Sequence, residues 1–473
     1  MVKVNKLALS VSAALILGAT GSAAQAATAA KTQTQQQVSD LQAQVAQLQQ
    51  LVQQLSTQQQ QQAAQQQEQA VQLQEAAIQA LEKPNVAPKE SSSKPGWLTL
   101  GDGQTQLKIY GSIRADSTYD FAGSNANTTD IYNRTNRVPL NSANATQGSL
   151  NVSAAASRIG LDVTRPTSYG DLVAKLEGDF LGTTYTNANG SFRVRHAYLT
   201  LGKWLLGQTG SIFVNGETIP EVVDANGPMG SGSQRNVQVR YTQPITKTQK
   251  VLVALEGGDA DGYTGTAQTS GGSRFPALTA RYDISTADKK GVLQVHGLVH
   301  ENRVSTNDTN AEEKLGWGAG IGAKYSLTPN DMVFANYYHV RGDNRYMLYS
   351  NTAYVATANG TSYTISPSEF DSALVGYSRK WNAQWRSTLA GGGIWYKDDN
   401  AYAKAFTTGV KPSASTNKTM YNIIVNTFYS PVKNVDIGAE YTYGQRETFA
   451  AATSTESNKG DFSRFNLMAR YQF

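Results

Sequence analysis

The sequence contains no cysteine. This absence excludes a disulfide-stabilised scaffold, a thiolate metal site and a cysteine nucleophile. Histidine is scarce, with four residues, and none of them stands in an HExxH or other metal-binding spacing. The G-x-S-x-G motif of a serine nucleophile is missing as well. We therefore expect neither an enzyme nor a protein with a bound cofactor or metal.

A large charge of one sign is also missing. The formal net charge is +5, and Lys3 and Lys6 carry two of these units (5 − 2 = 3 for the rest). This excess is too small and too dispersed for a nucleic-acid-binding face. The apolar run at residues 7–17 is too short to cross a bilayer as a helix. Because two lysines precede it and Ala24-Gln25-Ala26 follows it, we predict that residues 1–26 are a secretory signal.

A glutamine-rich segment follows the signal, at residues 27–83. Within residues 38–55, valine and leucine alternate at the two seam positions of a heptad repeat, which predicts a coiled-coil helix in the periplasm. The residues are Val38, Leu41, Val45, Leu48, Val52 and Leu55. The alternative is a polar, low-complexity tether. Valine at one seam and leucine at the other favours two strands, so this pattern does not itself argue for a trimer.

Proline and serine end this segment and predict a linker at residues 84–106. From residue 107 to Phe473, apolar and polar side chains alternate in about sixteen segments. In the last segment, for example, Phe465, Leu467 and Tyr471 share one face and Arg464 and Arg470 the other. This pattern suits a sheet with lipid on one side and water on the other. We predict an all-β fold, a transmembrane antiparallel up-and-down β-barrel of about sixteen strands in the outer membrane.

The connections between these segments are alternately short and long. The short ones contain turn-forming residues and lie at 166–170, 243–245, 328–331 and 430–434. The long ones are rich in Asn, Ser, Thr and Gly and lie near 122–148, 215–233, 261–272, 349–365 and 399–417. Short turns belong in the periplasm and long loops outside the cell, where they meet lipopolysaccharide. A barrel of this width leaves a water-filled channel.

Several basic residues are expected near mid-height on the inner face. They are Arg114, Arg158, Arg195 or His196, His296 and Arg464. Since closure places the last strand beside the first, we expect Arg464, Arg114 and Arg158 to stand side by side. Such a group would concentrate anions and bind a carboxylate through two hydrogen bonds. Arg195 and His196 are adjacent, so without a β-bulge only one can face the lumen, and we expect one of the two assignments to be wrong.

The connection at 215–233 contains three acids, Glu217, Glu221 and Asp224, and is the natural candidate for a constriction loop. If it folds inward, the acidic loop and the cationic wall would face each other across the narrowest point. A second interpretation is structural. Arg158 lies nearly opposite Glu177 and Asp179 across a tight hairpin, and such pairs hold strands in register.

Glycines interrupt two predicted strands. The spacing of Gly318, Gly320 and Ala323 imitates a dinucleotide fingerprint, but no helix follows it. We therefore interpret these glycines, and those at 391–393, as sites of close packing or of lumen width.

The chain resembles the DcaP-like outer-membrane porins of Gram-negative bacteria. The resemblance is carried by residues 107–111, 157–161, 170–172, 177–180, 195–198, 207–208, 238–241, 430–432, 434–436 and the terminal Phe473. It implies a trimer of sixteen-stranded barrels, a third extracellular loop that folds inward, and passive uptake of dicarboxylates and related small anions.

The sequence therefore favours a porin that prefers small anions. One alternative is a general, weakly selective porin whose arginines are balanced by the loop acids. Another is a structural or adhesive barrel. A helix of about fifty residues would reach roughly 75 Å, which raises the hypothesis that the periplasmic segment contacts peptidoglycan.

Overall fold

The computed structural model describes residues 50, 53, 96–125, 132, 135–140, 145–182, 190–214, 216–224, 226–232, 234–263, 268–269, 272–307, 310–360, 362–407, 416–451 and 457–473. The chain divides into two compact units, residues 1–87 and 88–473. In the first unit only Gln50 and Gln53 are described, and both are helical. The predicted signal, nearly all of the coiled-coil segment and residues 84–95 of the linker therefore lie outside the described residues.

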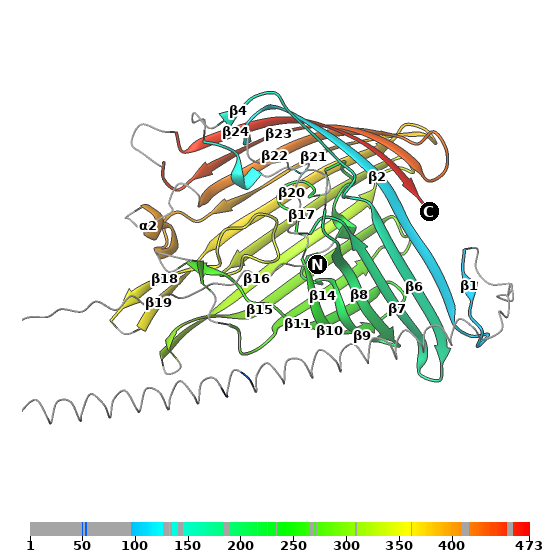
Figure 1. Ribbon diagram of the computed structural model, residues 1–473, viewed down its shortest axis with the longest axis horizontal. Helices are drawn as coiled ribbons and strands as arrows, with labels where there is room; N and C mark the ends of the chain where they lie inside the picture. The colour runs from blue at the N-terminus through cyan, green and yellow to red at the C-terminus, as the bar shows by residue number, and fades with distance from the viewer. Residues whose placement is uncertain are drawn as a thin grey trace, which may run out of the picture. The chain divides into compact units, whose positions relative to one another are not determined.

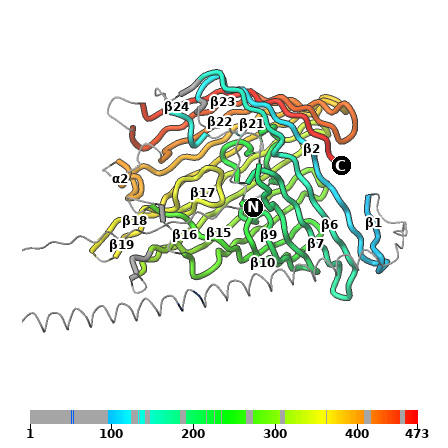
Figure 2. Tube along the Cα trace, viewed as in Figure 1, coloured from blue at the N-terminus to red at the C-terminus, as the bar shows by residue number. Residues whose placement is uncertain are grey.

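The second unit consists mainly of antiparallel strands (Figures 1 and 2). Its main sheet has eighteen strands; β1 (Leu98–Thr99) is a short addition to β2, and β5 continues β6 after a break, which leaves sixteen barrel strands among the described residues. They are β2 (Gln106–Ala122), β5 with β6 (Ser149–Ser153, Arg158–Thr167), β7 (Gly170–Asp179), β8 (Arg193–Leu201), β9 (Trp204–Gly210), β10 (Arg235–Pro244), β11 (Gln249–Glu256), β14 (Ala277–Ser285), β15 (Gly291–Asn307), β16 (Asn310–Ser326), β17 (Asp331–Arg341), β20 (Glu369–Lys380), β21 (Trp385–Tyr396), β22 (Asn417–Tyr429), β23 (Val435–Thr448) and β24 (Lys459–Gln472).

The sheet closes on itself because the first strand pairs with the last. Strand β2 is bonded to β6 along one edge and to β24 along the other. Closure leaves no unpaired barrel edge, which a sheet in hydrocarbon requires. The predicted antiparallel barrel of sixteen strands is confirmed.

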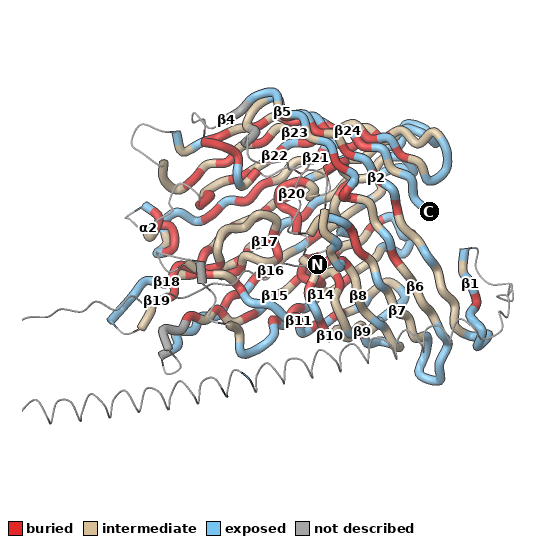
Figure 3. Tube along the Cα trace, viewed as in Figure 1, coloured by how far each residue is buried: buried red, intermediate tan, exposed pale blue. Residues whose placement is uncertain are grey.

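Side chains alternate across the barrel wall as predicted. On β2 and β24, Ile113 and Leu467 are 63% and 45% exposed on the outer face, whereas Arg114 and Asn466 are buried on the inner face. Figure 3 shows this alternation along the strands as changes between buried and exposed positions. Apolar side chains left exposed on every strand are stable only against lipid, so the outer face is a membrane surface.

The four predicted short turns join β6 to β7, β10 to β11, β16 to β17 and β22 to β23. The opposite end of the barrel carries further elements. They are β3 (Ser124–Asn125), β4 (Ala145–Thr146), η1 (Thr135–Arg137), β12 (Gly262–Tyr263), β13 (Gln268–Thr269), β18 (Tyr354–Asn359), β19 (Ser362–Pro367) and α2 (Ala401–Thr407). The short helix η2 (Gly216–Thr218) instead contacts the inner face of β16 and β17. Among the described residues, no helix has the length and apolar character needed to span a membrane.

One side of the barrel interior is filled by an apolar core. Its members come from the inner faces of β14–β22 and from three connections, at 211–234, 342–353 and 397–416. They include Phe213, Met229, Leu298, Tyr338, Val340, Tyr346, Phe370, Ile394, Tyr402 and Phe406, all buried. The strands on the other side, β2 and β6–β10, contribute few residues to this core.

Candidate functional site

The connection between β9 and β10, residues 211–234, lies inside the barrel. We call it the third loop. Arg114 Nη2 on β2 donates to the carbonyl of Val223 at 2.7 Å, and Asn422 on β22 accepts from the Met229 amide at 2.9 Å. Since β22 belongs to the wall opposite the strands from which the loop departs, and β2 lies four strands away from β9, the loop crosses the lumen. The expected inward constriction loop is present.

Two buried glutamates hold this loop in place. Glu256 accepts hydrogen bonds from the Ser211 hydroxyl at 2.9 Å, Asn236 at 3.0 Å, Thr279 at 2.7 Å and Tyr346 at 3.1 Å. Its side chain therefore joins the start of the third loop to β10, β14 and a further loop. A carboxylate with this many donors is stable without solvent.

Glu440 on β23 fixes the middle of the loop. It accepts the backbone amides of Val223 at 2.6 Å and Asp224 at 2.9 Å, and the Asn426 side chain at 3.1 Å. Glu440 is 1% exposed. The loop amides would have no water to bond at this depth, so the glutamate satisfies donors that the inward fold removes from solvent.

Wall glycines provide the space that the loop occupies. A Cβ added at Gly318 would lie 2.6 Å from the Phe213 ring, and one at Gly376 would lie 2.8 Å from Pro220. The same conflict arises between Gly322 and Thr218, Gly438 and Val223, and Gly392 and Met229. The interpretation of Gly318 and of residues 391–393 as close-packing positions is confirmed for Gly318 and Gly392.

The loop acids contact wall cations directly. Glu221 accepts two hydrogen bonds from Arg386, at 2.7 and 2.9 Å, and lies 3.6 Å from Arg470. Glu217 bonds to Lys324 at 3.3 Å. Asp224 is 2% exposed, and its carboxylate accepts from the Asn226 amide at 2.9 Å. The acids do not face the predicted arginines across a gap, and the cations that Glu217 and Glu221 contact were not predicted.

The predicted row of Arg464, Arg114 and Arg158 is wrong for Arg464 alone. Arg158 stands opposite Ser112, two residues from Arg114 on the same face of β2, and lies within electrostatic range of Arg114. Arg464 stands opposite Asp120 and binds it through two hydrogen bonds, at 2.5 and 2.9 Å, whereas Arg470 stands opposite Arg114. Asp120 is six residues above Arg114, or about 20 Å along the strand. The reason is the stagger between strands that barrel closure requires, which counting from the turns ignores. Arg114 itself is paired with Asp116 at 2.6 Å.

A β-bulge corrects the expectation for Arg195 and His196. The register between β7 and β8 shifts at Glu177 and Gly178, so both side chains face the lumen. Arg195 binds Glu177 at 3.1 Å and Asp179 at 2.7 Å, and His196 Nδ1 lies 2.9 Å from the Thr209 hydroxyl.

Four arginines gather around these two carboxylates. Arg193 binds Asp179 at 2.8 Å, and Arg158 lies 3.9 Å from Glu177. Arg235, at the start of β10, lies within electrostatic range of the other three. We call Arg158, Arg193, Arg195 and Arg235 the arginine cluster. With Glu177 and Asp179 it carries a net charge of +2 (4 − 2), and the side chains of Arg158 and Arg193 are each 41% exposed.

His296 does not line the pore. It is 3% exposed, its Nδ1 lies 3.0 Å from the Ile212 carbonyl oxygen, and its ring packs against Phe213. The predicted alternation was right, because the side chain points inward, but the third loop covers it.

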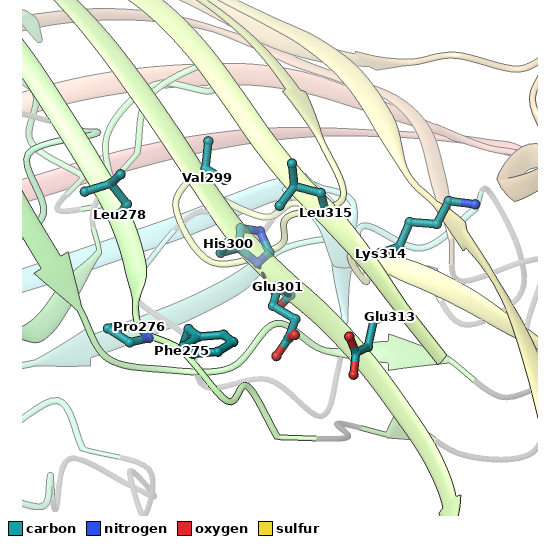
Figure 4. A pocket seen from close by; sticks show the side chains of 9 residues that line it. All are labelled: Phe275, Pro276, Leu278, Val299, His300, Glu301, Glu313, Lys314 and Leu315. Atoms are coloured by element: carbon teal, nitrogen blue, oxygen red, sulfur yellow. Dashed lines mark hydrogen bonds between the residues drawn. The ribbon is translucent and has the colours of Figure 1, made fainter. Parts of the chain in front are cut away.

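Outside the lumen, a hollow of about 350 Å³ lies over β14, β15 and β16. Its lining includes the outward Leu278, Val299 and Leu315, and Phe275 at its edge (Figure 4). It is separate from the pore. Among the described residues, no group of three or more histidine, aspartate or glutamate side chains could hold a metal ion.

A closed barrel with an apolar outer face and a charged lumen narrowed by an inward loop is an outer-membrane channel of Gram-negative type. A sequence model of the DcaP outer membrane protein family matches residues 24–473, and the chain belongs to that family. The structure is similar to that of the outer membrane channel DcaP of Acinetobacter baumannii, with 31% identity, a TM-score of 0.68, and coverage of 79% of this chain and 98% of that one.

A more distant similarity is to an anion-selective porin from Comamonas acidovorans, with 12% identity, a TM-score of 0.50, and coverage of 78% and 100%. That likeness shows the fold alone. A comparison with curated protein sequences found no match.

Proposed function

We propose that this channel conducts small solutes passively and prefers anions, including dicarboxylates, over cations. The observation that carries the proposal is the arginine cluster, in which three guanidinium groups contact two carboxylates and a fourth, that of Arg235, lies within electrostatic range of them. A fixed positive charge in a narrow, low-dielectric passage raises the local anion concentration, and guanidinium groups bind carboxylates through paired hydrogen bonds.

The position of the cluster supports this proposal. The apolar core fills the lumen beside β14–β22, where the inward Leu298, Phe370 and Ile394 are at most 2% exposed. On β6 and β8, Arg158 and Arg193 keep solvent contact. A solute therefore passes along the wall that carries the unbalanced arginines.

A general porin with weak selectivity is the second candidate, because several lumen cations are neutralised. Arg114 is paired with Asp116, Arg464 with Asp120, and Arg386 and Arg470 with Glu221 and Asp436. These pairs contribute little field at a distance, so the choice between the two functions depends on the lumen cations that are not neutralised, above all the arginine cluster.

Reversal potential in a planar bilayer under a salt gradient tests the proposal. We expect anion selectivity and concentration-dependent current block by a small dicarboxylate. Replacing Arg158 and Arg235 by Gln lowers the cluster charge from +2 to zero and should abolish most of the selectivity. The matched control is Arg379→Gln. Arg379 lies on the outer face of β20, as the exposed Val375 and Tyr377 do, and it binds Asp331 there, away from the lumen. Near-zero selectivity of the unmodified channel would favour the general porin, and no conductance would favour a structural barrel.

The assembly of the protein is a separate proposal. We propose a homotrimer in contact with outer-membrane lipid and lipopolysaccharide, with residues 27–83 forming a periplasmic helical segment that approaches peptidoglycan. Deleting residues 31–83 tests the role of the segment. Unchanged trimer stability and unchanged recovery with peptidoglycan after this deletion would contradict it.

A further inference from the structure

A second basic group lies on the periplasmic side of the third loop. Its members are Arg240 on β10, Arg281 on β14 and Lys250 on β11, and all three occupy inward positions of their strands. Arg240 and Arg281 are within electrostatic range of each other. None of the three was a predicted site residue, and none belongs to the arginine cluster.

The strand register shows how they are arranged. Arg240 is opposite Ala254 and Arg281 is opposite Leu252, both on the intervening strand β11. The two arginines are therefore two strands apart, about 10 Å across the sheet, and are offset by two residues, about 7 Å, along it. Ile212 of the third loop packs on Leu252 and Ala254. The base of the loop thus rests between the two arginines.

The charges in this group are incompletely paired. Asp283 binds Arg281 at 2.7 Å and Lys250 at 3.4 Å. Arg240 forms no ion pair or hydrogen bond with any described residue, and its Nε is shielded from solvent without a partner. The three cations and Asp283 carry +2 (3 − 1). Glu256 is also within range of Arg240 and lowers this sum to +1 (3 − 2), but its oxygens accept hydrogen bonds from residues that anchor the third loop and do not bond to Arg240.

A buried guanidinium nitrogen without an acceptor is costly, and an incoming carboxylate supplies the missing acceptor. We propose that Arg240 and Arg281 form a second carboxylate-binding subsite on the periplasmic side of the third loop, with Lys250 adding positive charge. This inference rests on the proposed anion preference. The arginine cluster lies level with the start of β10, and Arg240 lies about 16 Å further along this strand toward the periplasm, so a dicarboxylate would move between two sites in series.

The test measures single-channel current block by succinate in full-length channels inserted in a known orientation. Succinate is added on the periplasmic side, and the mean duration of each blocking event is measured. In Arg240→Gln we expect this duration to fall by at least about tenfold, because one charge-assisted hydrogen-bonded pair is lost. Anion selectivity should persist, because the arginine cluster is intact. Arg379→Gln is the matched control and should behave like the unmodified channel.

A conservative variant, Arg240→Lys, distinguishes the loss of the guanidinium geometry from a general disturbance of the fold. Arg240→Lys keeps the charge but loses the two-pronged guanidinium, and we expect block times between those of the unmodified channel and Arg240→Gln. If the unmodified channel is anion-selective and blocked by succinate, but neither variant changes the block, the subsite is refuted and the proposed function stands. If the unmodified channel shows neither selectivity nor block, both proposals fail.

Discussion

The attachment of the third loop to Glu440 makes a quantitative prediction. Replacing Glu440 by alanine leaves the Val223 and Asp224 amides buried without an acceptor. Each unsatisfied amide costs about 1–3 kcal/mol, so the inward position of the loop loses about 2–6 kcal/mol relative to a released state. Even the lower figure changes the equilibrium between the two positions about 30-fold.

Hydrogen exchange of the full-length protein measures this change. We expect the amides at 221–224 to exchange at least about 30-fold faster in Glu440→Ala, while those of β22 and β23 remain protected. Glu440→Gln keeps one acceptor oxygen but turns an amide group toward the second donor, so its effect should be intermediate. Glu447→Ala is the control, because Glu447 pairs with the exposed Lys459 at 3.4 Å, away from the loop. Equal exchange in the unmodified protein and in Glu440→Ala would refute the role assigned to this glutamate.

Three further predictions follow from the same interior. Gly318→Ala should lower the thermal stability of the folded barrel by about 1–3 kcal/mol, because its Cβ would meet the buried Phe213, whereas Gly297→Ala, with no atom within 4 Å of its Cβ, should be neutral. Arg386→Ala removes the main partner of Glu221 and should move the reversal potential toward cations; an unchanged potential would mean that Glu221 does not face the conducting path. Burial by itself would raise the pKa of Asp343, but the hydrogen bond from His300 and the charge of Arg345 hold this pKa below the ordinary value of 3.8. The ionised Asp343 therefore stabilises the folded state above pH 3.8, and this stabilisation is lost as the pH falls through the lower pKa of the folded state. Hydrogen exchange at 343–347 should therefore stay slow from pH 7 to about 4 in the unmodified protein, and exchange that accelerates well above pH 4 would contradict this assignment.

The barrel could be predicted from the sequence because it depends on local patterns. Alternation along a strand requires only that one face meet lipid and the other the lumen, so Leu467 and Tyr471 were assigned correctly without knowledge of their partners. Turn residues such as those at 430–434 are equally local. Closure of the sheet then follows, since open edges are unstable in hydrocarbon.

The site was predicted less well because it depends on relations between strands and loops, namely the stagger of neighbouring strands, a β-bulge and a loop that folds inward. Alternation places Arg470 and Arg464 on the inner face, but only the stagger between β2 and β24 decides which of them stands beside Arg114. The bulge at Glu177 and Gly178, which brings Arg195 and His196 to the same face, has no sequence signal comparable to a proline or a turn. His296 shows the third case, a correctly oriented residue covered by a loop distant in sequence.

Selectivity in this lumen depends on the net fixed charge, which is small because most positive side chains are paired with negative ones. Most inner arginines are held by carboxylates, which makes them part of the wall and of the loop attachment: Arg386 positions Glu221, and Arg464 joins β24 to β2 through Asp120. Such pairs hold their geometry but contribute little field at a distance. Arg235 and Arg240 differ because they lack ion pairs among the described residues, and they lie on one strand, on either side of the point where the third loop meets the wall. We therefore assign the anion preference to the arginine cluster and assign to Arg240 a separate binding step. Among the paired arginines, loss of Arg386 should act on selectivity through the freed Glu221, whereas loss of Arg464 should first affect the stability of the barrel.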